Sequence, residues 1–126
     1  MDYSEIRSIL ETHLTANWSR TPIAYENVPF DPPEQEPWIR CILQPVHQET
    51  SSLGDLCKRT YASYWIQIFT PLNEGSGEAY NIAAELEPLF RHRQINGITF
   101  TVPTITHVGD DGNGWYMLIL KAPCWV

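Results

Sequence analysis

Hydrophobic residues near the C-terminal end of the chain follow the pattern of two paired strands. Ile98 to Val126 contains two runs rich in β-branched and aromatic residues, the types that favour strands. Between them, residues 110–114 read DDGNG, and Gly, Asn and Asp tolerate the backbone angles of tight turns. We therefore predict a hairpin. Because Trp115 to Leu120 is almost continuously apolar, the second strand is expected to lie inside a sheet with cover on at least one face.

Two segments show the apolar spacing of helices. From Asp2 to Trp18 apolar residues recur every three or four positions, with Asp2 or Ser4 suited to cap the first turn. A second helical stripe follows a glycine-rich turn in which Ser76 is the predicted cap. Pro88 interrupts this stripe. Since proline cannot donate to the carbonyl four residues back, we expect a kink or a new turn there.

Alternating apolar and polar residues predict further strands in the middle of the chain. Residues 23–26 fit a short strand, Trp38 to Val46 fits a longer one, and Thr60 to Thr70 fits the longest. Four prolines between Val28 and Pro37 indicate a stiff, extended loop. The polar stretch His47 to Arg59 is predicted to be a long loop, either mobile or used for contact.

A tight turn is also predicted at Asn96-Gly97, just before a strand over residues 98–102. The order is therefore helix, strands, helix, strands. Without strict βαβ alternation, this order predicts an α+β fold. We expect an antiparallel sheet of about five to six strands with two α-helices packed on one face, and one domain spanning residues 1–126.

Composition narrows the classes of function. The chain has 126 residues, enough for a core without disulfide or metal. Its net charge of −7 argues against nonspecific nucleic-acid binding, which depends on clustered Lys and Arg. The three cysteines lack CxxC spacing and indicate a reduced chain. The N-terminus lacks the pattern of a signal peptide, and no apolar run is long enough to span a membrane, so we expect a soluble compartment.

No established catalytic motif is present, and we predict no catalytic, cofactor or metal site. His107 lies near Asp110 and Asp111, which could form an acid-base pair or half a metal site, but a DDGNG turn already accounts for both acids. The same turn lacks the distal Glu of a calcium loop. Four residues could be considered as zinc ligands: Cys41, Cys57, Cys124 and His47. They lack the paired close spacing of zinc sites.

Several segments together resemble a known family. The most specific are Asn27-Val28-Pro29-Phe30, followed by Pro32 and Pro37-Trp38, and the turn at residues 108–112 before Trp115-Tyr116. With these pieces the chain resembles bacteriophage tail terminator-like proteins, also called tail completion or minor tail proteins. The resemblance covers nearly the whole chain, from the N-terminal helix through residues 21–45 and 66–71 to the C-terminal strands.

The resemblance implies a structural virion protein and not an enzyme. Similar proteins form a homo-oligomeric ring, a hexamer, which caps the finished tail tube, stops tube polymerisation and supports head-tail joining. The implied partners are other copies of the chain, the tail tube protein and a head-completion or connector protein. DNA would pass through the ring without specific binding, helped by like-charge repulsion, and no membrane is involved. The implied location is the virion tail, and the host bacterial cytoplasm during assembly.

Two other functions stay open at this point. The first is a neck or head-tail connector protein of similar size. The second is a small enzyme or ligand-binding domain, for which His107 with Asp110 is the starting point.

Protein contacts are expected on two loops and one aromatic strand residue. The first loop is long and polar and spans residues 46–59, and the second is glycine-rich and spans residues 71–77. Tryptophan often anchors interfaces. The alternative is that both loops are simple connections. The predicted contact residues are Lys58, Arg59, Trp65, Leu53 and Asn73.

Overall fold

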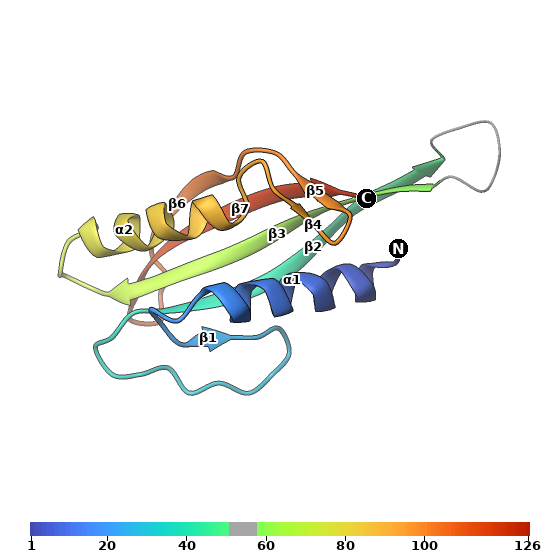
Figure 1. The fold of residues 1–126 in the computed structure, drawn as a ribbon. Coiled ribbons are helices and arrows are strands. Elements are labelled where there is room, and N and C mark those ends of the chain that lie inside the picture. The colour runs from blue at the N-terminus through green and yellow to red at the C-terminus, as the bar shows by residue number, and fades with distance from the viewer. Residues whose placement is uncertain (51–57) are drawn as a thin grey trace.

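Seven strands form one curled sheet in the computed structural model, which describes residues 1–50 and 58–126 (Figure 1). The strand order is β1-β2-β3-β7-β5-β4, and β6 pairs with β7. The elements are α1 (Tyr3–Asn17), β1 (Ile23–Ala24), β2 (Trp38–Thr50), β3 (Lys58–Pro71), α2 (Gly77–Leu86), the 3-10 helix η1 (Glu87–Leu89), β4 (Gln94–Ile95), β5 (Ile98–Phe100), β6 (Thr104–Asp110) and β7 (Trp115–Trp125). The predicted α+β class with two α-helices is confirmed.

α1 begins and ends close to the predicted positions, and α2 begins directly after the predicted cap residue Ser76. The Asp2 side chain caps α1 by accepting a hydrogen bond from the backbone N–H of Glu5 at 2.8 Å. Ser76 occupies the cap position of α2 but makes no side-chain cap bond. Pro88 lies in the first turn of η1, where its missing N–H costs little. The predicted new turn at this proline is therefore confirmed.

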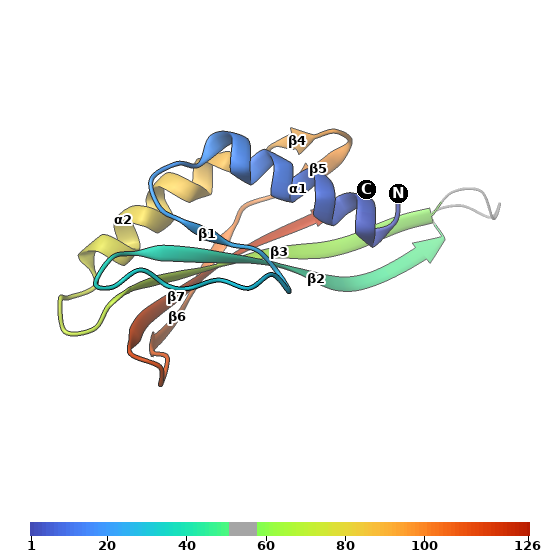
Figure 2. The same cartoon turned by 90° about the horizontal axis from the view of Figure 1, so that it is seen from below.

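The larger of two buried clusters joins the helices to the sheet. It contains the apolar stripes of α1 and α2 together with alternate residues of β2, β3 and β7, among them Ile6, Leu10, Leu14, Ile39, Ile66, Ile82, Leu86, Leu118 and Leu120. Figure 2 shows the two helices running along the central strands, with the β6–β7 turn reaching away from them. This cluster is the main source of hydrophobic stabilisation, because its residues are almost fully removed from water.

The predicted sheet is too simple in two respects. It has seven strands instead of five to six, and it is not purely antiparallel, because β1 pairs with β2 in parallel through Ile23 opposite Ile39. Parallel neighbours need a long connection, and the proline-rich segment 25–37 supplies it. The short strands β4 and β5 extend the sheet by curling over the larger cluster, where Ile98 and Phe100 are buried.

The predicted polar loop from His47 to Arg59 is wrong at both ends. β2 continues to Thr50 and β3 begins at Lys58, so residues 47–50 and 58–59 are paired strand. Pro45 does not end β2, because its nitrogen faces the outer edge, as those of Ile39 and Leu43 do, and its missing N–H removes no bond to β3. Cross-strand contacts hold the extension together: the His47 ring stacks on Tyr61 at 4.4 Å, and the Tyr61 hydroxyl donates to Glu49 at 2.9 Å.

The C-terminal prediction is confirmed. β7 lies inside the sheet, with β3 on one side and β5 and β6 on the other. β6 and β7 form the predicted hairpin, and Asn96 and Gly97 form the predicted tight turn, with φ angles of 47° and 91°. The predicted strand 98–102 ends earlier, at Phe100, since the chain leaves β5 before Pro103 and re-joins β7 as β6.

Candidate assembly surfaces

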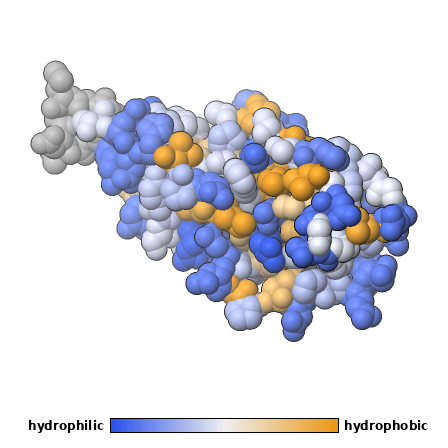
Figure 3. Space-filling view, turned by 180° about the vertical axis from the view of Figure 1, so that it is seen from behind, coloured by the Kyte–Doolittle hydropathy of each residue, from blue (hydrophilic) through white to orange (hydrophobic). Residues whose placement is uncertain are grey.

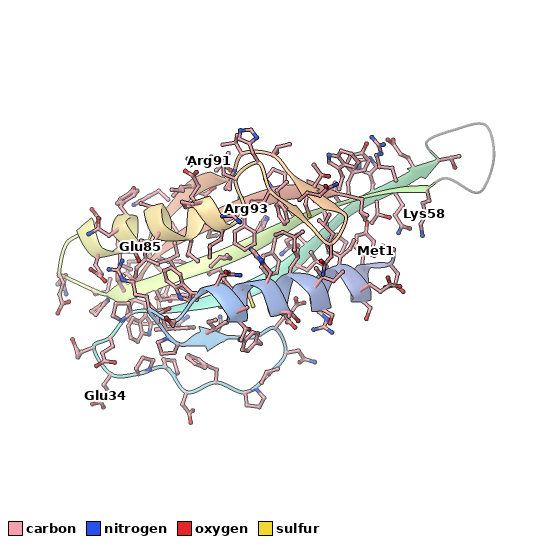
Figure 4. All side chains as sticks on the ribbon, viewed as in Figure 1. Met1, Glu34, Lys58, Glu85, Arg91 and Arg93 are labelled. Atoms are coloured by element: carbon pink, nitrogen blue, oxygen red, sulfur yellow. The ribbon has the colours of Figure 1, made fainter. Side chains whose placement is uncertain are left out.

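The predicted contact residues do not form one site. Lys58 and Arg59 begin β3, Trp65 lies in the middle of that strand, and Asn73 lies in the turn after it with φ of 66°. Leu53 falls outside the described residues. In Figure 4, Lys58 lies on the hairpin that projects from one end of the molecule, and Glu34 of the proline-rich segment lies towards the other end. The structure therefore offers several separate surfaces.

The first surface is a face of the sheet that collects tryptophan. Side chains that alternate with the larger cluster point to the opposite side of the sheet. Four of the five tryptophans do so, and we call their surface the tryptophan face; they are Trp38, Trp65, Trp115 and Trp125. Trp38 stacks on Phe69 at 4.0 Å and lies edge-on to Trp115 at 5.8 Å. These rings form the centre of the second buried cluster.

Three cationic side chains lie over the rings of the tryptophan face. Arg40 lies 5.1 Å from the Trp38 ring centre, Arg59 lies 4.2 Å from that of Trp125, and the Lys121 ammonium lies 4.4 Å from that of Trp65. Cation-π contacts of this kind hold long side chains flat on the sheet. In Figure 3, which views the molecule from behind, hydrophobic patches are separated by hydrophilic side chains.

A hollow of about 670 Å³ lies where three turns meet, and Asn73 is one of its lining residues. The other walls are the proline-rich segment, Leu72, and Gly114 with Trp115. It is lined by polar and apolar groups from loops and brings together no histidine or cysteine. Among the described residues, no group of three or more His, Cys, Asp or Glu is placed to hold a metal ion.

The acids beside His107 are engaged by the turn itself. The Asp110 carboxylate accepts the N–H of Gly112 at 2.8 Å, and the Asp111 carboxylate accepts the N–H groups of Asn113 at 2.7 Å and Trp115 at 3.1 Å. These bonds fix the turn geometry. The His107 ring instead lies 5.9 Å from the ring of Tyr116. Backbone geometry thus accounts for both acids.

The two cysteines in the described residues are buried thiols. Burial raises the pKa of Cys41 above its ordinary value and raises the pKa of Cys124 to about 12. Metal binding and nucleophilic attack both require the thiolate. Since burial disfavours that form here, both thiols are suited to packing and not to chemistry.

A second surface is the projecting hairpin, which we call the arm and define as Val46–Thr50 of β2 with Lys58–Thr60 of β3. Every residue from Val46 to Thr50 is exposed. The arm extends past the end of β7. The last backbone hydrogen bonds between β3 and the C-terminal segment join Thr60 to Val126, the residue after β7. Figure 1 shows the arm leaving the body of the protein with no helix beside it.

A third surface is the outer edge of β2, whose first half is closed. The N–H of Ile39 donates to the carbonyl of Pro22 at 3.1 Å, and the N–H of Leu43 donates to the Glu26 carboxylate at 3.1 Å. Pro45 has no N–H to donate. Unpaired edge groups attract strands of other molecules. The first half of β2 is therefore protected against such pairing.

The edge of β6 has no such protection. β6 pairs with β7, and no other strand of the described chain lies on its second side. Residues 104–108 carry no acidic or basic group other than His107, four of the five are β-branched, and Ile105 and Val108 are each 42% exposed. Edge strands are normally blunted by charges, prolines or bulges. In β6 the bulge, which lies between His107 and Gly109, and the acid Asp110 come only at the end.

Comparison with known proteins identifies the class of protein to which these surfaces belong. The family model described as phage tail terminator protein matches residues 5–120. The chain belongs to the phage tail terminator family. This match confirms the resemblance noted in the sequence, and it gives the tail terminator a structural role in a phage tail. No curated protein matches the chain.

Solved structures share the fold of this tail terminator. One of them has 21% sequence identity and a TM-score of 0.73, over 100% of this chain and 96% of the other. At this identity the likeness supports the fold alone. Within the described residues, no helix has the length and apolar character needed to cross a membrane.

The surfaces that depend on strand pairing leave little signal in the sequence. Trp65 was predicted as a contact residue, but its place beside Lys121 requires the register of β3 with β7. The open edge of β6 left a usable signal in the sequence, since five consecutive residues of high strand propensity contain no Lys, Arg, Asp or Glu. The closed edge of β2 leaves a weaker signal in the sequence, because Glu26 lies far from Leu43 along the chain.

Proposed function

We propose that this tail terminator caps the end of the tail tube as a homo-oligomeric ring, a hexamer, which stops tube polymerisation and supports head-tail joining. The single observation that carries the proposal is the family match over residues 5–120. The surfaces are consistent with it, because an exposed arm and an open strand edge are devices for contact between proteins.

We also propose that DNA passes through the ring without specific binding, and the net charge of −7 supports this. Like charges repel, so an acidic lumen would not retain a phosphate backbone. Three of the cations that could bind phosphate are instead stacked on tryptophan rings, at Arg40, Arg59 and Lys121. The partners of the ring are then the tube protein on one side and a head-completion or connector protein on the other.

Binding to isolated tail tubes tests this function. Purified protein is added to tubes that are still able to elongate, and tube ends are examined by electron microscopy. The proposal expects rings at one end of each tube and no growth from capped ends. A neck or connector protein would instead bind head-completion proteins and leave tube ends bare, and that result would reject the capping function.

A further inference from the structure

Two strand edges of five residues each have no partner strand among the described residues. One is the arm edge, Val46–Thr50, which begins where the protection of β2 ends. The other is residues 104–108 of β6. Val46 is 58% exposed and Ile105 is 42% exposed, so each edge also presents an apolar side chain. A two-stranded ribbon such as the arm has little stability alone in water. Both edges therefore gain from a partner strand.

The backbone groups available on each edge follow from the register. The N–H of Leu43 points away from β3, to Glu26, and alternate residues of a strand point the same way. The register shift between Pro45 and His47 moves the outward set to even-numbered residues, including Gln48. The arm edge thus offers donors and acceptors that no described strand uses.

The same reasoning applies to β6. Thr60 and Val126 exchange both backbone hydrogen bonds, at 2.8 and 2.9 Å, so even-numbered residues of β7 bond to β3. Odd-numbered residues of β7 therefore bond to β6, where Thr106 lies opposite Ile119. This arrangement leaves the N–H groups of Ile105 and His107 pointing outward.

Charge selects the direction in which the two edges can meet. Lys58 is exposed and lies opposite Thr50 at the far end of the arm edge. β6 ends at the exposed Asp110. Only a parallel alignment brings Thr50, and Lys58 beside it, to the end of β6 that carries Asp110. An antiparallel alignment would place these opposite charges at opposite ends.

We propose that the arm edge of one copy adds in parallel to the open edge of β6 in the next copy, and that this contact repeats around the ring. The contact is heterologous, joining two different surfaces, which is what a closed ring larger than a dimer requires. Pairing of β6 with β6 across a two-fold axis would stop at a dimer. The inference rests on the proposed ring-forming function and assigns the surfaces through which it acts.

Proline substitutions with matched alanine controls test the contact. Gln48→Pro and Ile105→Pro each remove an outward N–H without removing a bond of the native sheet, whereas Gln48→Ala and Ile105→Ala keep the N–H and shorten the side chain. We expect at least tenfold weaker self-association for each proline variant and a change within about threefold for each alanine variant. Gln48→Ala and Gln48→Pro both lose the side-chain hydrogen bond from Gln48 to Thr60, so the difference between them reports the loss of the backbone N–H.

A mixing experiment separates this contact from a symmetric one. In a one-to-one mixture of Gln48→Pro and Ile105→Pro chains, only one pairing is intact: the arm of the second variant on β6 of the first. Native mass spectrometry of the mixture should therefore show dimers containing one chain of each variant. Complete rings, or no association in the mixture, would overturn the proposal.

An exposed charge pair gives a test that does not depend on proline. Lys58→Glu should weaken association about twofold to fivefold at low salt. Adding Asp110→Lys to Lys58→Glu should strengthen association relative to Asp110→Lys alone, a comparison in which both chains lack the carboxylate that accepts the Gly112 N–H. All variants are assayed in solution and on tail tubes, with folding checked by circular dichroism. Rings of the proline variants on tubes, equal to the wild type, would refute the contact and leave the capping function standing. If the wild-type chain forms no ring either in solution or on tail tubes, the contact is refuted. Tube ends that remain bare would also refute the capping function itself.

Discussion

Replacing Trp38 tests whether the tryptophan face contains a second stabilising core. Trp38 is only 3% exposed and is surrounded by aromatic rings, with Phe69 stacked at 4.0 Å, Phe30 at 5.1 Å and Trp115 edge-on at 5.8 Å. The Arg40 guanidinium lies over its ring. A change to alanine removes the central member of this group, so all of these contacts are lost together.

The expected cost is large for a domain of this size. Truncation of a buried tryptophan to alanine destabilises by about 3–5 kcal/mol, and each aromatic pair contributes about 0.5–1.5 kcal/mol within that total. The whole protein is expected to be stable by about 5–15 kcal/mol. Trp38→Ala should therefore lower the free energy of unfolding by about 3–5 kcal/mol and reduce the midpoint of urea unfolding sharply.

Two control variants separate packing from other effects. Trp38→Phe keeps a ring on Phe69 and removes an indole N–H that is buried without a partner among the described residues. The relief of that buried donor offsets part of the lost volume, so we expect a cost below about 1.5 kcal/mol. Val28→Ala, at a residue that is 56% exposed, should change stability by less than about 0.5 kcal/mol.

Urea unfolding followed by far-ultraviolet circular dichroism measures all three variants without relying on tryptophan fluorescence. A loss below about 1 kcal/mol for Trp38→Ala would refute the reasoning. Such a result would mean that the rings of the second cluster pack well only in an assembly and contribute little to the isolated chain.

Three further predictions concern the turn, the guarded edge and the buried thiols. Asp111→Ala removes the acceptor of the Asn113 and Trp115 N–H groups and should cost about 1–2 kcal/mol, more than Asp110→Ala, which frees one N–H, when both are measured by urea unfolding. Glu26→Ala leaves the Leu43 N–H without its acceptor and opens the edge of β2, so it should aggregate faster on heating than Glu26→Gln, and equal rates would contradict this role. Because burial raises the folded-state pKa of Cys124 from 9.0 to about 12, the stability from its neutral thiol is fully present below pH 9 and is lost between pH 9 and 12, and Cys124→Ala should flatten that decline in unfolding midpoints.

Local patterns predicted much of the fold because local physics decides them. Asp2 caps α1 with a bond to a residue three positions on, and the Asn96-Gly97 turn depends on two residues that accept positive φ. The new turn at Pro88 follows from its missing N–H. These features need no knowledge of the distant chain.

Features that depend on distant residues were not predictable in the same way. β1 pairs in parallel with β2 across the proline-rich segment, and nothing near Ile23 specifies that partner. The strands of the arm are polar and therefore resemble a loop in the sequence, and what holds them is the cross-strand contact of His47 and Glu49 with Tyr61. The candidate surfaces share this property, since the tryptophan face exists only once β2, β3 and β7 are in register.

The measurement that tests the central claim most directly is the length of tails made without this protein. Electron micrographs of a phage whose gene for this chain is disrupted should show tails of abnormal, variable length that fail to join heads, and supplying the intact chain should restore uniform joined tails. Tails of normal length, joined normally to heads, in the absence of the chain would contradict the account.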